Sequence, residues 1–135
     1  MTIFILIFWI LFSSLEGIRE GYYWFFKPKD IKEKHEHLVF TIQRTFVFSF
    51  IVILMLFIKI SIFKTLITGI SLMCVFPFIH DGFYYLTRNY LNPSDYPKRF
   101  LDSSTTSSAK IELSLIQRLA LFISGLVLIS TYYLI

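Results

Sequence analysis

The sequence is poor in the residues that build disulfide scaffolds, collagen-like chains and disordered segments. It has one Cys, four Pro and five Gly among 135 residues, and charged residues make up only 16% of it. A single Cys excludes an intramolecular disulfide, and so little Gly and Pro excludes a collagen-like or low-complexity chain. Low charge together with high hydrophobicity is also the opposite of the composition that keeps a chain disordered.

What the sequence has in excess is apolar side chains. Hydrophobic residues make up 56% of the chain, including 16 Phe and 8 Tyr, whereas a soluble domain has about 45–50%. A chain of this length forms one domain, and a water-soluble fold of that size cannot bury so much apolar surface. The composition therefore predicts an integral membrane protein with a single domain over residues 1–135.

Four stretches are apolar over the length that a membrane-spanning helix needs, about 20 residues. They predict an all-α fold in which four transmembrane helices form an up-down bundle. The beginning of the chain lacks the basic residues and the cleavage site of a signal peptide, so the first helix is expected to be retained. The helices are expected at about 2–26, 31–58, 64–90 and 109–134.

The sequence signals for the ends of these helices differ in strength. Pro28 should stop the first helix, and Asp30 followed by Glu33 predicts the N-cap of the second. Between Lys59 and Lys64 there is no Gly or Pro. A continuous helix over 38–76 would be about 58 Å long, too long for one bilayer, so a tight hairpin is expected between the two lysines.

The Lys and Arg residues beside the predicted spans set the orientation. Four lie in the stretch 27–37 and four in 88–110, whereas the short hairpin has two and the chain ends have none. Loops at about 27–37 and 91–108 are therefore expected to face the cytoplasm, with both termini on the non-cytoplasmic side of a multi-pass membrane protein. The net charge of +4 then reflects attraction to an anionic leaflet. No nucleic-acid partner is expected, because acids are mixed with the bases in these loops.

Two short segments occur twice in the same order. Glu20-Gly21-Tyr22-Tyr23 is echoed by Asp81-Gly82-Phe83-Tyr84-Tyr85, and Ile42-Gln43-Arg44 by Ile116-Gln117-Arg118. One interpretation is a duplication that gives two parallel-repeat helical hairpins, related by an axis along the membrane normal. The other is chance, because short matches are easily found in a chain this rich in Tyr and Ile.

Ionisable residues of the four predicted helices fall at one depth. At 1.5 Å per residue most of them lie within about 10 Å of the cytoplasmic surface. Arginine suits carboxylate pairing in a dry setting, and the lysines stay in loops or at helix ends. Four carboxylates oppose four arginines: Glu16, Glu20, Asp81 and Glu112 with Arg19, Arg44, Arg88 and Arg118.

This charged depth has two interpretations. Arginine–carboxylate pairs can lock the helices together, or the groups can form a ligand- or ion-binding site open to the cytoplasm. The candidate binding residues are Glu16, Arg19, Glu20, Arg44, His80, Asp81, Tyr84, Gln117 and Arg118. Weaker candidates for a metal site are Glu20, His37, His80 and Asp81, which lack the Glu-x-x-His repeats of di-metal bundles.

Small residues at four-residue spacing mark a helix-packing face. Ser13, Gly17 and Gly21 let another helix approach closely, either within the chain or from a second copy. We expect a non-enzymatic subunit of a membrane complex, with the lipid bilayer and other membrane subunits or a second copy as partners. The alternatives are a component that transports a proton, an ion or a small solute, and a membrane enzyme or metal-binding protein acting on a lipid or anionic substrate. The sequence identifies no catalytic residue and no cofactor.

Overall fold

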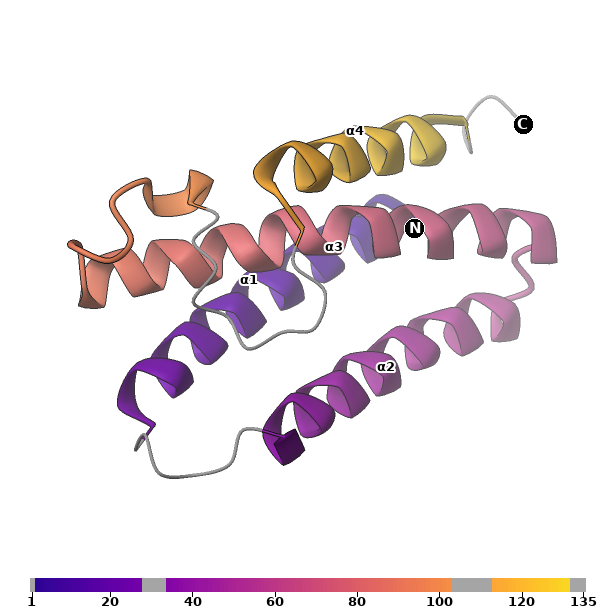
Figure 1. Ribbon diagram of the computed structural model, residues 1–135. Coiled ribbons are helices and arrows are strands. Elements are labelled where there is room, and N and C mark those ends of the chain that lie inside the picture. Colours follow the sequence, from indigo (N-terminus) through magenta and orange to yellow (C-terminus); the bar gives the residue numbers. More distant parts are fainter. Residues whose placement is uncertain (1, 28–33, 103–112, 132–135) are drawn as a thin grey trace.

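The computed structural model describes residues 2–27, 34–102 and 113–131, and these residues form helices and no strand. The α-helices are α1 (Thr2–Phe26), α2 (Lys34–Phe57), α3 (Ile62–Leu91) and α4 (Leu115–Thr131), with a short 3-10 helix, η1 (Arg99–Leu101), before the last (Figure 1). The prediction of an all-α fold with four helices is confirmed for this part of the chain. The predicted N-cap at Asp30, with Glu33, lies outside the described residues.

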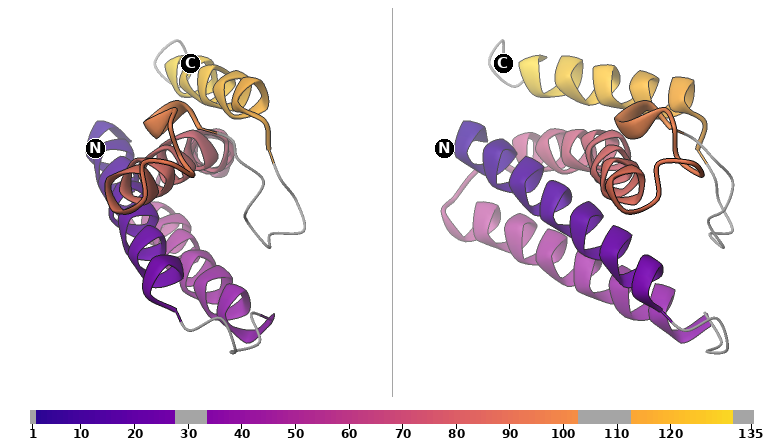
Figure 2. Two further views of the ribbon diagram at one scale, coloured as in Figure 1. Left: turned by 60° about the vertical axis from the view of Figure 1, so that its left-hand side comes forward. Right: turned by 90° about the vertical axis from the view of Figure 1, so that its left-hand side faces the viewer.

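The third helix, α3, is the centre of the fold. It packs most extensively against α1 and α4, and less against η1 and α2. The first two helices lie on one side of α3 and α4 lies on the other (Figures 1 and 2). Successive helices run in opposite directions, so the beginning of α1 and the end of α4 lie at the end of the molecule where α2 turns into α3 (Figure 2).

A tight turn joins α2 to α3 in the stretch where the sequence predicts a hairpin. Lys59 adopts a left-handed φ of 62°. The Ile60 amide donates to the Met55 carbonyl and the Lys59 amide to the Leu56 carbonyl, both at 3.0 Å. This is the Schellman arrangement, in which the left-handed position is usually Gly. Ser61 then caps α3 by accepting a hydrogen bond from the backbone amide three residues later.

The last helix begins later than the sequence predicts. A helix is expected from about residue 109, whereas Leu113 and Ser114 are not helical and α4 starts at Leu115. The Ser114 amide donates to Gln117 Oε1 at 2.8 Å, and the Gln117 amide donates to Ser114 Oγ at 3.3 Å. This reciprocal pair is a capping box, which fixes the start of a helix. The predicted start is therefore wrong.

Two of the four helices are long and apolar enough to cross a membrane. These are α2, from Glu36 to Phe57, and the whole 30-residue length of α3. The 25-residue helix α1 carries three charged residues in its second half, and α4 has 17 residues, or about 25 Å at 1.5 Å per residue. The prediction of four spans therefore goes beyond what length and composition alone give.

Polar and apolar side chains are distributed in the reverse of the pattern in a water-soluble domain. The buried residues of the helices include two Glu, one His, one Arg and several Ser and Thr. Large apolar side chains are exposed on all four α-helices. On α2, for example, Phe46 and Phe57 are 73% and 82% exposed.

A small apolar core fills the half of the molecule nearer the described chain ends. Trp9, Ile51, Met55 and Leu72 are buried there and come from α1, α2 and α3. The Trp9 indole donates a hydrogen bond of 2.7 Å to the Leu72 carbonyl, which satisfies its polar group inside apolar surroundings. The buried charged side chains lie in the other half.

Candidate functional site

Two glycines bring the backbone of α1 against α3. A Cβ atom at Gly17 would lie 2.2 Å from the His80 carbonyl oxygen, and one at Gly21 would lie 2.8 Å from Thr87 Cβ. Only glycine permits so close a separation of the two helices. The third predicted packing residue, Ser13, is buried one turn earlier on α1 and donates its hydroxyl to a backbone carbonyl of the same helix. The glycine face thus packs within the chain.

This close approach places Glu20 of α1 beside His80 of α3. Glu20 Oε2 and His80 Nε2 are 3.0 Å apart, and both side chains are nearly fully buried. Arg44 of α2 pairs with the same Glu20 oxygen, and its Nη2 lies 2.8 Å from His80 Nε2. Trp24 Nε1 donates to the other Glu20 oxygen at 3.1 Å. Three helices therefore meet at one carboxylate.

A second buried carboxylate, Glu16, lies one turn before Glu20. Its Oε2 is 2.7 Å from Arg19 Nη2 and 3.7 Å from Arg44 Nε. Gln43 bridges this group, because its Oε1 accepts from Arg19 at 2.7 Å and its Nε2 donates to Glu16 at 3.4 Å. The sequence does not single out Gln43 as a site residue. The available signal is its place directly before Arg44 in a segment that occurs twice.

Asp81 connects His80 of α3 with Arg118 of α4. Its Oδ1 is 2.8 Å from His80 Nδ1 and its Oδ2 is 3.9 Å from Arg118 Nε. The Asp81 side chain is 34% exposed, whereas that of Arg118 is 1% exposed. Arg118 Nη2 donates to the Asp102 carbonyl at 2.6 Å, and its guanidinium lies over the ring of Tyr85. We call the connected set the ion-pair layer: Glu16, Arg19, Glu20, Gln43, Arg44, His80, Asp81 and Arg118.

His80 joins the two halves of the ion-pair layer. Its Nδ1 faces Asp81, and its Nε2 lies within hydrogen-bond distance of both the Glu20 carboxylate and the Arg44 guanidinium. A doubly protonated ring donates to both carboxylates, whereas a ring protonated only at Nδ1 donates to Asp81 and accepts from Arg44. Because Arg44 only donates and the Glu20 carboxylate only accepts, each protonation state satisfies one of the two groups that face Nε2 and opposes the other.

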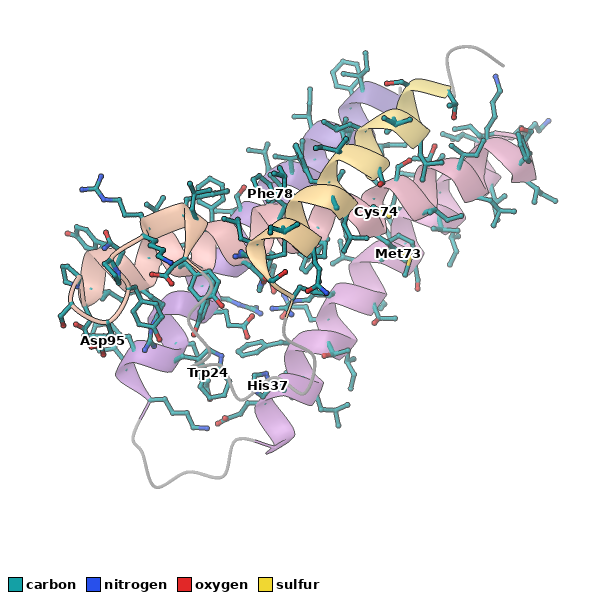
Figure 3. All side chains as sticks on the ribbon, turned by 45° about the horizontal axis from the view of Figure 1, so that its top comes forward. Trp24, His37, Met73, Cys74, Phe78 and Asp95 are labelled. Atoms are coloured by element: carbon teal, nitrogen blue, oxygen red, sulfur yellow. The ribbon has the colours of Figure 1, made fainter. Side chains whose placement is uncertain are left out.

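Three of the predicted binding or metal residues make other contacts. The ring of Tyr84 packs edge-on against Tyr85, with centroids 5.1 Å apart. Gln117 is exposed and caps α4. His37 stacks on Trp24 with ring centroids 4.7 Å apart, and the two side chains lie side by side at the ends of α2 and α1 (Figure 3). Depth along a helix predicted these residues, but the direction in which each side chain points separates them from the layer.

The remaining predictions at this depth concern metal ligands and two further charges. In the described ranges, no three His, Cys, Asp or Glu side chains form a group that could hold a metal ion. Arg88 lies over the rings of Phe25 and Tyr96, at 5.9 and 4.9 Å from the centroids. Glu112 lies outside the described residues.

The two repeated segments occupy corresponding places in the two helical hairpins. In the first hairpin, Glu20 of α1 pairs with Arg44 of α2. In the second, Asp81 of α3 faces Arg118 of α4. Each carboxylate and each arginine comes from the repeated segments, so the echo in the sequence coincides with the same kind of contact in each hairpin.

No protein-family model, no curated protein and no solved structure matches this chain. The ion-pair layer and the exposed apolar surface are the features of the molecule that bear on its function.

Proposed function

We propose that this chain is a multi-pass integral membrane protein, with four transmembrane helices and both termini on the non-cytoplasmic side. The observation that carries the proposal is the combination of large apolar side chains on the outside with paired charges inside. Charged residues within a bilayer face the protein interior and pair there, and the hydrocarbon accepts exposed Phe, Ile and Leu. The same arrangement in water would leave apolar patches far larger than a soluble monomer exposes.

The topology can be tested with single cysteines. In a Cys74→Ser background, Ser94→Cys and Ser61→Cys place one thiol in the loop after α3 and one in the turn before it, both at exposed positions. The proposal expects opposite accessibility to a membrane-impermeant maleimide in intact cells, with Ser61→Cys labelled and Ser94→Cys labelled only after permeabilisation. Equal labelling of both, or release of the protein by alkaline carbonate, would contradict it.

We further propose that the chain acts as a non-enzymatic subunit of a membrane complex. At one end of the layer the Glu16 and Glu20 carboxylates pair with Arg19 and Arg44 of the chain itself, which favours a structural role for these charges. In addition, α2 packs less extensively against α3 than α1 and α4 do, and it exposes phenylalanines along its length. This face is the one that we expect a partner subunit to cover.

The subunit role is tested by purification in a mild detergent followed by cross-linking. We expect a complex larger than the monomer, with cross-links that map to the outer face of α2. Phe46→Trp and Phe50→Trp change that face, while Ile116→Trp is a matched control on the exposed face of α4. A strictly monomeric protein without cross-linked partners would rule out this role.

Proton transport is a second candidate, which the position of His80 favours. The ring lies between two carboxylates and can exchange protons with either. Proton flux into liposomes containing the purified protein, lost in Glu20→Gln and Asp81→Asn, would support transport. Flux that is unchanged in both variants would exclude this pathway.

A further inference from the structure

The two hairpins place unequal numbers of carboxylates in the ion-pair layer. In the first hairpin, Arg44 lies near both Glu16 and Glu20. The corresponding positions of the second hairpin, each 61 residues later, are Pro77 and Asp81. Among the described residues, the arginine of the second hairpin therefore has one carboxylate where that of the first has two.

Within the described residues, Arg118 is consequently left with unused hydrogen-bond donors. It is fully buried, and neither its Nε nor its Nη1 has a hydrogen-bond partner in the part of the chain that the structure describes. The nearest Asp81 oxygen is 3.9 Å from Nε, and the other Asp81 oxygen faces His80. Of the three guanidinium nitrogens, Nη2 alone has an acceptor among the described residues, the Asp102 carbonyl. Unpaired donors on a buried guanidinium are costly, and a bound anion removes that cost.

Arg88 also has buried N–H donors that lack a hydrogen-bond partner within the described part of the chain. Its Nε and Nη1 are also buried without a hydrogen-bond partner among the described residues. The Arg88 guanidinium lies 4.9 Å from the ring centroid of Tyr96, that of Arg118 lies 5.2 Å from the centroid of Tyr85, and the two rings are 6.1 Å apart. The tyrosine rings thus hold both cations in place by their faces and leave N–H donors available. By contrast, Arg19 and Arg44 each leave only Nε without such a partner.

We propose that Arg118 binds the phosphate group of an anionic phospholipid at this end of the ion-pair layer, with Arg88 beyond the tyrosine pair adding positive charge beside the site. Guanidinium donors match the spacing of phosphate oxygens, and basic pockets between helices at the cytoplasmic side of a membrane hold anionic head groups. The Asp81 side chain is 34% exposed, whereas those of Glu16 and Glu20 at the other end are nearly fully buried, so a head group can approach the layer from the Asp81 end. The site rests on the membrane location proposed above.

The test uses the full-length protein in nanodiscs of phosphatidylcholine, with or without phosphatidylglycerol. Native mass spectrometry counts the retained lipids, and thermal unfolding reports their effect on stability. We expect the wild type to retain phosphatidylglycerol and to unfold at a higher temperature in its presence. Arg118→Gln should weaken this binding about tenfold or more, because a charged hydrogen-bond partner is lost. Arg99→Gln removes the same charge from an exposed position on η1 and should leave binding nearly unchanged.

Further arms separate the sources of phosphate and the modes of failure. Inorganic phosphate added to phosphatidylcholine discs should stabilise the protein less than phosphatidylglycerol does. Equal stabilisation would overturn the lipid assignment, in favour of a soluble phosphate. If Arg118→Gln does not fold, Arg88→Gln carries the test, and wild-type binding in that variant would refute the site. A protein that does not enter nanodiscs contradicts the membrane proposal, whereas one that enters without preferring phosphatidylglycerol contradicts only this inference.

Discussion

Replacing Gly17 by Ala should separate α1 from α3 and disconnect the centre of the ion-pair layer. The new Cβ atom would lie 2.2 Å from the His80 carbonyl oxygen, which is backbone and cannot swing aside. Relieving the overlap requires α1 to move by about 1 Å, since the interior is close-packed. A movement of that size away from α3 lengthens the Glu20–His80 distance from 3.0 Å to about 4 Å, beyond a hydrogen bond.

The size of the effect follows from three contributions. Losing a hydrogen bond between charged groups costs about 1.5–3 kcal/mol, and overpacking costs about 1–3 kcal/mol. Alanine has a better helix propensity than glycine, which offsets these losses by about 1 kcal/mol. The free energy of unfolding should therefore fall by about 1.5–5 kcal/mol.

Far-UV circular dichroism during titration of detergent micelles with SDS measures this free energy. Gly69→Ala on α3 is the matched control, because its Cβ would make an ordinary contact of 3.5 Å with Phe48. That variant should lose no stability, and helix propensity should add up to about 1 kcal/mol to its free energy of unfolding. If Gly17→Ala behaves like Gly69→Ala, the close contact does not support the layer and the reasoning is wrong.

Three further variants test individual contacts by the same SDS titration. Trp9→Phe removes the donor of the buried bond to Leu72 and should cost about 1–3 kcal/mol, whereas an unchanged midpoint would mean that the bond contributes nothing. Arg44→Gln leaves Glu20 without its arginine and should lower the free energy of unfolding by about 3–5 kcal/mol. The double variant Arg44→Gln/Glu20→Gln should recover part of this loss, and no recovery would argue against a direct pair. Ser114→Ala removes the hydroxyl that caps α4 and should cost about 1 kcal/mol, so full stability would show that the capping box is not needed.

The helices follow from composition, but their ends depend on local hydrogen bonds. The hairpin after α2 could be placed because an uninterrupted helix there would be too long for a bilayer. The geometry of this turn could not be predicted, because Lys59 occupies the left-handed position at which Gly is the usual residue. The sequence pattern places the start of α4 too early for a related reason. The apolar pattern continues across Ser114, whereas the two hydrogen bonds between Ser114 and Gln117 fix the start of the helix.

The depth of the charged residues was predictable, but most of their partners were not. Helical spacing alone predicts that Arg19 lies beside Glu16, and this pair is present at 2.7 Å. The contact between Glu20 and His80 depends on the separation of α1 and α3, which is fixed by the fit of Gly17 against a backbone carbonyl. Such a fit has no signature in the spacing of polar residues. Sequence spacing therefore identifies contacts within one helix better than contacts between helices.

The order of the helices along the chain has a consequence for biogenesis. Glu20 belongs to α1, whereas its partners Arg44 and His80 belong to α2 and α3, which the ribosome makes later. In the proposed membrane setting, α1 emerges with Glu16 and Glu20 opposed only by Arg19. Its release into lipid is therefore expected to wait at the insertion machinery until α2 and α3 have been made. In that case α1, α2 and α3 enter the lipid together, and insertion is complete only after α3, the central helix of the fold, has been made.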